Sequence, residues 1–464
     1  MRSARALCFL SALLLALPAA AQRPHARSVP LQRPRPREVP LETPASPAPR
    51  VTEPAAPVAP PAGTAAPRAA AVDTEPADIT VTVITYSPGE EVFERFGHNA
   101  IWVHDGRSGT DIAWNWGVYD FAQPDFLQRF LSGDTKYWME GDDAYRMIAG
   151  YHDLGRTITL QRLNLTQAQA ASLRDFVQWN SREENKYYRY DYFRDNCSTR
   201  LRDAIDRVLG GALRRATDTV QTPLTYRSES VRLTDGLAPA QLGIDVALGR
   251  PADRPLTEWE SFFIPMRLRD ALSTVTVPSA NGSAVPLVSD QRTIPPTSGP
   301  VVSIPERVPS LSLRYFVLGV LLAALAVILR VLGKSNRAAM WGLALLGMLW
   351  SLLCGVIGVL LIYMWAFTRH VFWGWNENLL LLSPLSLALV ILLPAALLRS
   401  RAVRPARAFS RIIAVLGVLA AFMSIAPGGQ ANLAIVALVL PMHLVLAWAL
   451  SLALPAPVRR DDRA

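Results

Sequence analysis

Cysteine is scarce in this chain, with only three among 464 residues. Cys8 lies in an apolar N-terminal run and Cys354 in a long apolar segment, so Cys197 is the only cysteine in the region between them. That region cannot form an internal disulfide. A lone thiol is either a small core residue or a reactive nucleophile, and the residues around Cys197 have to distinguish the two.

The sequence also lacks the common spacings of a metal site and of a serine hydrolase. None of the six histidines occurs in an HxH, HxxxH or HExxH pattern, which disfavours a metal site built from His98, His104 and His152 with Asp105 or Asp153. No GxSxG occurs either, so a serine nucleophile elbow is disfavoured. We therefore expect neither a metal nor another cofactor.

The first 76 residues are typical of an export signal followed by a tether. Two arginines precede an apolar run that ends in small residues, which predicts a signal peptide over residues 1–21. Residues 22–76 contain fourteen prolines and no periodic apolar face, which predicts a disordered tether, partly in the polyproline conformation. We therefore expect the next domain outside the cytoplasm.

Five apolar stretches near the C-terminus predict a transmembrane domain over residues 311–455, followed by a cytoplasmic tail at 456–464. Each stretch is close to the roughly 20 residues that a bilayer core requires, the fourth being the shortest. The predicted spans are about 313–332, 339–367, 379–398, 410–426 and 432–454.

The loops between these stretches predict the orientation. Eleven lysines and arginines lie on one side, against Arg369 alone on the other, so the first side is cytoplasmic. The chain is then a multi-pass inner-membrane protein with its N-terminal domain in the periplasm and its C-terminus in the cytoplasm. The net charge of +9 resides in the cytoplasmic loops and the tether, so it gives no indication of nucleic-acid binding.

Residues 77–272 are predicted to form an α+β domain. Alternating or β-branched runs predict four strands, at 78–86, 98–105, 111–121 and 156–165. Helical patterns cover 166–179 and 196–209, and three more helical pieces follow. Residues 273–310 are rich in Pro, Ser and Gly, which predicts a linker to the first span.

Cys197 stands in the stretch YRYDYFRDNCST, where a predicted helix begins. A thiol reacts as thiolate, and a helix N-terminus with a nearby imidazole lowers its pKa. Three histidines could supply the imidazole: His98, which starts a strand, His104 and His152. His98 and His104 are six residues apart, so both cannot reach one thiol. Asn115 lies on the following strand, where it could orient His98.

The motifs FGH, ending at His98, and DNCST, around Cys197, resemble a known fold. With WNWG between them they look like a circularly permuted papain-like fold of the NlpC/P60 superfamily, in which the histidine strand precedes the cysteine helix. The C-terminal spans bring the resemblance closer to the Lnb-type lipoprotein N-acyltransferases of bacterial envelopes. In the outward loop it rests on Thr368, His370, Asn376, Asn378, Leu379, Leu380 and Pro384.

This resemblance implies a thiol acyltransferase. His98 would accept the proton of Cys197, and the thiolate would take an acyl chain from a phospholipid and pass it to the N-terminal amine of a diacylglyceryl-cysteine lipoprotein. The backbone N–H of Cys197 and the Asn196 side chain would form the oxyanion hole, with Asn115 as the third catalytic residue. The partners would be the phospholipid donor, the lipoprotein acceptor and the membrane.

The predicted outward loop, TRHVFWGWNEN, suggests a substrate contact at the membrane surface. In this interpretation His370, Asn376 and Asn378 bind the amphipathic substrate. The simpler alternative is an aromatic belt with polar residues at the level of the lipid headgroups.

Two other functions are compatible with parts of the sequence. A periplasmic NlpC/P60-like cysteine peptidase or amidase acting on peptidoglycan would use the same Cys197 and His98, but it needs no multi-pass domain with a polar outward loop. A membrane scaffold whose periplasmic domain only binds a partner would tolerate the loss of both residues.

Overall fold

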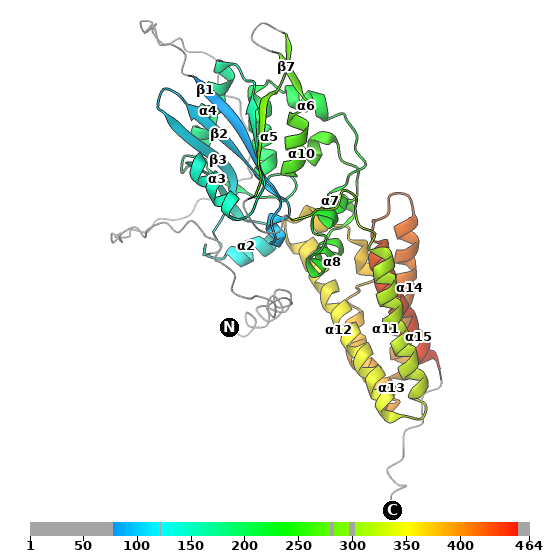
Figure 1. Cartoon of the computed structure of the whole chain (residues 1–464). Coiled ribbons are helices and arrows are strands. Elements are labelled where there is room, and N and C mark those ends of the chain that lie inside the picture. The colour runs from blue at the N-terminus through cyan, green and yellow to red at the C-terminus, as the bar shows by residue number, and fades with distance from the viewer. Residues whose placement is uncertain (1–77, 121, 279–282, 297–301, 453–464) are drawn as a thin grey trace, which may run out of the picture. The chain divides into compact units, whose positions relative to one another are not determined.

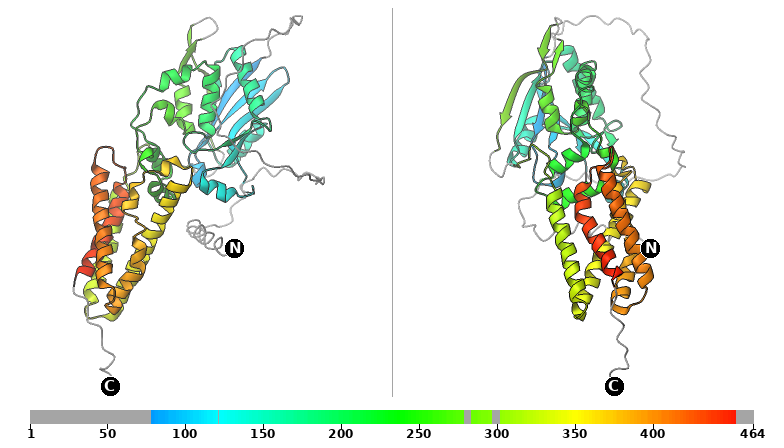
Figure 2. Two further views of the ribbon diagram at one scale, coloured as in Figure 1. Left: turned by 180° about the vertical axis from the view of Figure 1, so that it is seen from behind. Right: turned by 90° about the vertical axis from the view of Figure 1, so that its right-hand side faces the viewer.

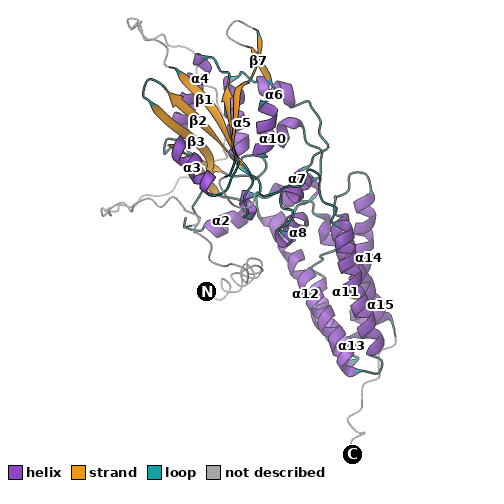
Figure 3. Cartoon of the chain, viewed as in Figure 1, coloured by secondary structure: helices purple, strands orange, loops and turns teal. Residues whose placement is uncertain are grey.

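The computed structural model describes residues 78–120, 122–278, 283–296 and 302–452. The predicted signal peptide, the whole of the tether and the C-terminal tail lie outside the described residues. Figure 1 colours the chain from the N-terminus to the C-terminus, and Figure 3 colours it by secondary structure. Both show that a sheet-rich domain comes first in the chain and that long helices follow. A domain of mixed α and β structure followed by a helical part is therefore confirmed.

The centre of the first domain is a seven-stranded sheet in which every strand pair is antiparallel. The strand order is β6-β4-β3-β2-β1-β5-β9, so the strands that carry His98 and Asn115, β2 and β3, are neighbours. The strands are β1 (Ile79–Tyr86), β2 (His98–Asp105), β3 (Thr110–Val118), β4 (Lys136–Asp143), β5 (Ile158–Leu163), β6 (Tyr187–Arg189) and β9 (Val288–Ile294). A separate two-stranded ribbon joins β7 (Thr276–Pro278) and β8 (Ala284–Pro286).

Helices cover both faces of the sheet because side chains alternate along each strand. Ile101 of β2 packs in the larger core with α4 and α5, whereas Ala100 packs on the opposite face with α3. These helices are α3 (Ala144–Asp153), α4 (Gln167–Asn180) and α5 (Cys197–Val208). By the same alternation, Asn99 faces α5 and His98 shares the face of Ala100.

Shorter helices surround this centre. A 3-10 helix, η1, precedes β2, and α2 lies between β3 and β4. Several helices follow α5 and lead toward the membrane helices. The bounds are η1 (Val92–Glu94), α2 (Phe126–Ser132), α6 (Ala212–Thr217), α7 (Tyr226–Leu233), α8 (Ala238–Ala247), η2 (Arg250–Ala252), α9 (Glu258–Ser261) and α10 (Pro265–Leu272).

Among the described residues, four helices are long and apolar enough to cross a membrane. They are α11 (Ser312–Leu332), α12 (Arg337–Phe367), α14 (Val403–Ile425) and α15 (Leu433–Ser451). A fifth helix, α13 (Ser386–Arg399), has 14 residues. Figure 2 shows these helices lying side by side.

Five predicted spans thus correspond to four long helices and one short one. The predicted third span, 379–398, begins with the 3-10 helix η4 (Glu377–Leu380) and is interrupted before α13. Pro384 lies in that interruption, where it lacks the N–H that a continuous helix requires. The fourth predicted span, expected to be short, is a helix of 23 residues.

The predicted strand 98–105 coincides with β2, and β1, β3 and β5 lie within three residues of their predicted bounds. The predicted linker over 273–310 is wrong in part, because β9 lies within it and pairs with β5 at the edge of the sheet. The side chains of β9 are mostly exposed, so it lacks the alternating apolar pattern of a half-buried strand. Backbone pairing with β5 holds it in the sheet. A side-chain hydrogen bond, from Gln161 Nε2 to Gln291 Oε1 at 3.0 Å, adds to this pairing.

Candidate active site

Cys197 is the first residue of α5, and the residue before it caps the helix. Asn196 Oδ1 accepts hydrogen bonds from the backbone N–H groups of Ser198 and Thr199 at 2.9 and 3.0 Å. Its Nδ2 donates to two backbone carbonyls at 3.0 and 2.9 Å. Both ends of this amide are occupied, so the structure does not fit the predicted use of the Asn196 side chain as an oxyanion donor. Asn196 instead fixes the helix start.

The thiol of Cys197 is buried beside the start of β2. Asn99, which follows His98, donates Nδ2 to Ser198 Oγ at 3.2 Å and so ties β2 to the start of α5. Burial raises the pKa of the Cys197 thiol to about 11, although hydrogen bonds from the backbone N–H groups of Asn99, Ser198 and Cys197 itself lower it. The resting thiol is therefore neutral, with donors beside it that favour a negative sulfur.

Gly117 of β3 brings the strand backbone close to Cys197. Its φ of +93° lies in the left-handed region, beside a register shift between Trp116 and Val118. A Cβ at this position would lie 3.7 Å from Cys197 Cβ and 4.0 Å from Tyr188 Oη. The glycine therefore permits both the irregular backbone and the close approach.

His98, the first residue of β2, lies among aromatic rings. Its ring centroid is 6.0 Å from that of Tyr86 and 6.0 Å from that of Tyr151, with interplanar angles of 15° and 12°. Burial lowers the pKa of His98 to about 4, a side-chain hydrogen bond with Asn115 raises it, and the positive charge of Arg156 lowers it. His98 is therefore neutral at pH 7, the form in which an imidazole accepts a proton.

Asn115 fixes one side of this imidazole. Its Nδ2 donates to the backbone carbonyl of Glu140 on β4 at 3.2 Å, which sets the orientation of the amide. Asn115 raises the pKa of His98, as expected when the amide oxygen accepts a hydrogen bond from the protonated ring. The structure thus brings His98 and Asn115 together on neighbouring strands.

Tyr151 of α3 lies between this pair and the thiol. Its ring stacks on Tyr86 with a centroid distance of 3.7 Å and also faces His98. Burial raises the pKa of Tyr151, the charge of Arg156 lowers it, and a negative Cys197 raises it.

In the part of the chain that the structure describes, no hydrogen bond joins His98 to Cys197, and the contact with the sulfur is made by the backbone N–H of the next residue, Asn99. Asn99 and Tyr151 instead connect the two residues. Catalytic hydrogen bonds of this kind are often long before substrate binds and tighten in the complex.

The other two histidines of the domain are engaged elsewhere. His104 Nδ1 lies 3.0 Å from Asp111 Oδ1, six residues or about 20 Å along β2 from His98. His152 Nε2 lies 3.1 Å from the carbonyl of Pro295. Of the three histidines, His98 is the one whose neighbour in the chain, Asn99, contacts the Cys197 sulfur.

Asn376 and Asn378 lie in a buried joint between the end of α8 and the segment after α12. Their residues are 3% and 0% exposed. Asn376 Nδ2 donates to the carbonyls of Val246 and Ala247, both at 2.9 Å, and Asn378 Nδ2 donates to Val246 at 3.0 Å. These carbonyls belong to the last turn of α8, where a helix supplies no partner. The two amides cap that helix, and the predicted substrate contact does not fit them.

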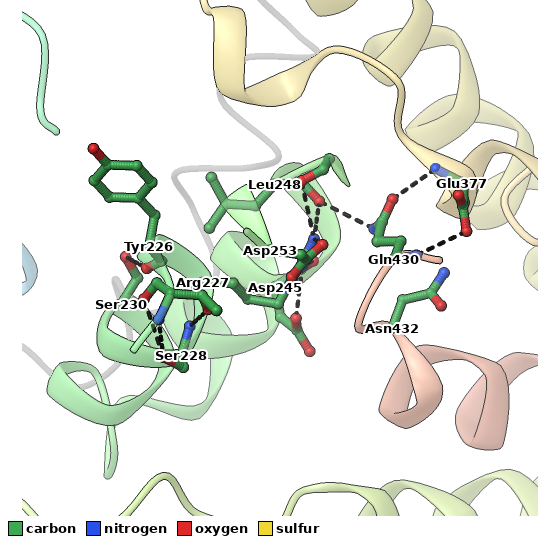
Figure 4. A network of polar contacts seen from close by, with 12 residues as sticks. Tyr226, Arg227, Ser228, Ser230, Asp245, Leu248, Asp253, Glu377, Gln430 and Asn432 are labelled. Atoms are coloured by element: carbon green, nitrogen blue, oxygen red, sulfur yellow. Dashed lines mark hydrogen bonds and ion pairs between the residues drawn. The ribbon is translucent and has the colours of Figure 1, made fainter. Parts of the chain in front are cut away.

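Polar contacts extend this joint on both sides (Figure 4). Gln430 Nε2 donates to the carbonyl of Leu248 at 3.1 Å, and the Glu377 backbone N–H donates to Gln430 Oε1 at 2.7 Å. Buried Arg227 pairs with Asp245 of α8 at 2.9 Å. The described residues belong to one compact unit, and this network connects its two halves.

His370, the third predicted substrate contact, is half-buried in a different environment. Its Nε2 lies 3.0 Å from the carbonyl of Phe130 on α2, and its ring lies 6.0 Å from that of Tyr192. Burial lowers the pKa of His370, and the Phe130 carbonyl raises it. His370 therefore lies next to the segment that leads into Cys197.

Sequence reasoning missed Tyr151, Asn99 and Gly117 as parts of this site. Strand alternation alone places Asn99 on the face that α5 covers. The sequence did contain a start signal for helix α3, since Asp143 is a residue type that caps helices. In the structure Asp143 accepts a hydrogen bond from the Arg146 backbone N–H at 2.8 Å. Nothing in the sequence reveals that Tyr151 meets His98, because that contact joins distant segments.

Residues 66–230 match the family model of the Lnb N-terminal periplasmic domain. This stretch of the chain is therefore similar to the Lnb periplasmic domain. It contains His98, Asn115 and Cys197 and ends within α7, so the match includes neither the joint nor the membrane helices. The matched family is the one that the sequence predicted for this domain. A periplasmic domain combined with four long apolar helices indicates an inner-membrane protein. No curated protein and no solved structure matches this chain.

Proposed function

We propose that this protein is a membrane-bound thiol acyltransferase that moves a fatty acyl chain from a phospholipid to the N-terminal cysteine amine of lipoproteins. The observation that carries the proposal is the position of Cys197 at the start of α5, where Asn99, the residue after His98, contacts the sulfur and Ser198 inside a domain that matches the Lnb model. A covalent cysteine intermediate lets one membrane-anchored substrate leave before the other arrives.

The first half-reaction starts from a neutral thiol and a neutral imidazole, because burial raises the pKa of Cys197 to about 11 and lowers that of His98 to about 4. The sulfur attacks the ester carbonyl carbon while its proton moves to His98. The carbon–oxygen bond of the ester then breaks. The lysophospholipid alcohol leaves with the proton from His98, and Cys197 holds the acyl chain as a thioester.

The oxyanion of this step is stabilised by backbone N–H groups. Those of Cys197 and Asn99 already lie beside the sulfur, and that of Cys197 belongs to the N-terminus of α5, where the helix dipole favours negative charge. They take the role that the sequence analysis gave to the side chain of Asn196.

In the second half-reaction the lipoprotein amine attacks the thioester carbonyl. His98 accepts the proton that the amine loses on forming the amide, and it returns this proton to the sulfur as the carbon–sulfur bond breaks. The products are the N-acylated lipoprotein and the free thiol of Cys197. Asn115 holds the imidazole in orientation in both halves.

The membrane helices support this choice of substrates, because donor and acceptor are both lipid-anchored. In the proposed topology the Lnb domain is periplasmic and the C-terminus cytoplasmic, as the loop charges predict. The order of the histidine strand β2 before the cysteine helix α5 supports a papain-like arrangement in circularly permuted order.

The two cysteines described in the structure provide a matched test. The purified full chain in phosphatidylethanolamine vesicles is incubated with a synthetic diacylglyceryl lipopeptide, and N-acylated product is measured by mass spectrometry. Cys197→Ala is expected to reduce product to background, and Cys354→Ala, in α12, to retain it. N-acylation by the Cys197→Ala variant would exclude the thiol mechanism. Cleavage of muropeptides without lysophospholipid release would favour the peptidase instead.

A further inference from the structure

A cavity of about 430 Å³ lies between the segment that leads into α5 and the segment that follows α12. The proposed chemistry leaves this cavity without a role, since neither His98 nor Asn115 lines it. Its volume is within the range of small-molecule sites, about 300 to 1,000 Å³. The lining residues are Arg189, Asp191, Arg194, Asp195, Arg369 and Val371.

Two of the three arginines are held in place from different parts of the chain. The guanidinium of Arg194 lies 4.8 Å from the ring centroid of Phe372, a residue that is 1% exposed. The backbone N–H of Arg369 donates to the carbonyl of Ser132 at 2.9 Å, and its Nη1 lies 3.1 Å from Asp134 Oδ1. The cavity is therefore lined by the segment before α5 and by the segment after α12, and the end of α2 holds Arg369 in place.

The two carboxylates of the lining serve the protein itself. Asp191 Oδ1 accepts hydrogen bonds from the backbone N–H groups of Phe193 and Arg194, both at 2.9 Å, which shapes the turn before Cys197. Asp195 accepts two hydrogen bonds from Arg200, at 2.5 and 2.8 Å. Arg200 pairs with Asp195 and Asp134 pairs with Arg369, so the three arginines and two aspartates of the lining keep an excess of positive charge.

A further cation faces the same edge of the sheet. Arg189 on β6 is registered directly opposite Lys136 on β4. Like charges directly opposite one another destabilise a strand pair. Lys136 Nζ lies 3.8 Å from the ring centroid of Tyr187, which offsets part of this cost. Of this opposed pair, Arg189 lines the cavity, where an anion would relieve the repulsion.

We propose that this cavity binds the phosphodiester of a glycerophospholipid headgroup. Planar guanidinium groups match phosphate oxygens in charge and geometry. Arg369 comes two residues after the end of α12, the level at which lipid headgroups meet a membrane helix. Asp195 lies two residues before Cys197, so a lipid held by its phosphate has its glycerol esters near the thiol.

This inference rests on the proposed function for the identity of the donor, but binding can be measured without acyl transfer. Free inorganic phosphate shares the phosphate chemistry, so the experiment needs two probes. The full chain carrying Cys197→Ala, in a phosphate-free maltoside detergent, is titrated by calorimetry with glycerophosphoethanolamine and, separately, with inorganic phosphate.

The variant to compare carries Arg189→Gln and Arg369→Gln, with the exposed Arg182→Gln as the matched control. We expect glycerophosphoethanolamine to bind, the double variant to weaken its Kd by about tenfold or more, and the control to leave it unchanged. Equal affinity in the double variant and the control would overturn the proposal. So would absence of binding, or binding of inorganic phosphate that glycerophosphoethanolamine does not displace.

A second readout separates this inference from the proposed function. In phospholipid vesicles, the same double substitution with Cys197 intact should raise KM for the donor by about tenfold and leave kcat near its original value. A lower kcat at constant KM would contradict a headgroup site. If headgroup binding depends on the arginines but no acyl transfer occurs, the cavity assignment holds and the acyltransferase proposal fails.

Discussion

Two polar regions of this molecule look alike in sequence and differ in structure. Each combines histidine and asparagine beside apolar segments, and each was predicted to contact substrate. At the start of α5, backbone N–H groups and the His98 ring lie around a thiol. In the joint, the side-chain amides of Asn376 and Asn378 are bonded to α8, to Gln430 and to Asn432. Polar residues near a membrane can thus join two domains as readily as they bind a ligand.

The difference follows from which end of a helix each region meets. The start of α5 presents N–H donors, which the Asn196 oxygen caps in part and which favour a negative sulfur. The end of α8 presents carbonyl acceptors, which the nitrogens of Asn376, Asn378 and Gln430 satisfy. Asparagine side chains therefore leave backbone N–H donors near the thiol in the first region, whereas in the second region they satisfy the carbonyls and leave no site for a ligand.

Among the substitutions that test this comparison, His98→Ala is expected to have the largest effect, which is on the rate of acyl transfer. Removing the general base should lower the rate of acyl transfer by about 10² to 10⁴-fold. The thermal midpoint should change little by comparison. His104→Ala, at the far end of the same strand, should retain the rate. Initial rates of lysophospholipid release would check both, and equal rates for the two variants would remove His98 from the mechanism.

Substitutions in the joint should instead lower the stability of the protein. Asn378→Leu leaves the buried side-chain amide of Asn432 without its partner, at a cost of about 1–3 kcal/mol, and removes one of the two hydrogen bonds to the Val246 carbonyl. We expect a lower Tm in scanning calorimetry and an unchanged KM for phospholipid. Asn164→Leu, at an exposed site, is the control. A raised KM at unchanged Tm would restore Asn378 as a substrate contact.

The pH dependence tests the environment of the imidazole. His98 must be neutral to act as a base, so the rate should stay level from pH 8 to 5 and fall only as the pH drops through its pKa of about 4. Asn115→Ala removes the hydrogen bond that raises this pKa and should move the acid limb lower. Asn115→Asp adds a negative charge and should move it higher. Single-turnover rates against pH would show an acid limb near 6.5 in the unaltered protein if this account is wrong.

The smallest effect is expected at Gly117. Alanine there must adopt a left-handed backbone, at about 1–2 kcal/mol. Because this strained backbone lies against Cys197, both the unfolding free energy and the acylation rate should fall. Gly109→Ala is the control, with φ of +65° and nothing within 4 Å of the added Cβ. Gly109→Ala should lower only the stability. If it lowered the acylation rate as much as Gly117→Ala does, the contact between the Gly117 backbone and Cys197 would not explain the loss of rate.

Local patterns predicted the elements that carry the candidate site. The run HNAIWVHD predicted β2 residue for residue, and the DNCST motif predicted a helix start that Asn196 caps. The edge strand β9 escaped prediction because backbone pairing, rather than an apolar face, holds it in the sheet. The contacts of Asn378 and Tyr151 escaped it because their partners lie more than forty residues away in the chain. Only the fold reveals which polar atoms are already bonded.

The most direct test of the central claim is the position of a covalent acyl group. The purified chain is incubated with phosphatidylethanolamine in the absence of acceptor, acid-quenched, digested and mapped by mass spectrometry. The account predicts a hydroxylamine-sensitive acyl thioester on the peptide containing Cys197, with one lysophospholipid released per modified thiol, and no adduct on Cys354. Acyl transfer to an added lipopeptide with Cys197 unmodified throughout, or an adduct that persists in the His98→Ala variant at the original rate, would contradict it.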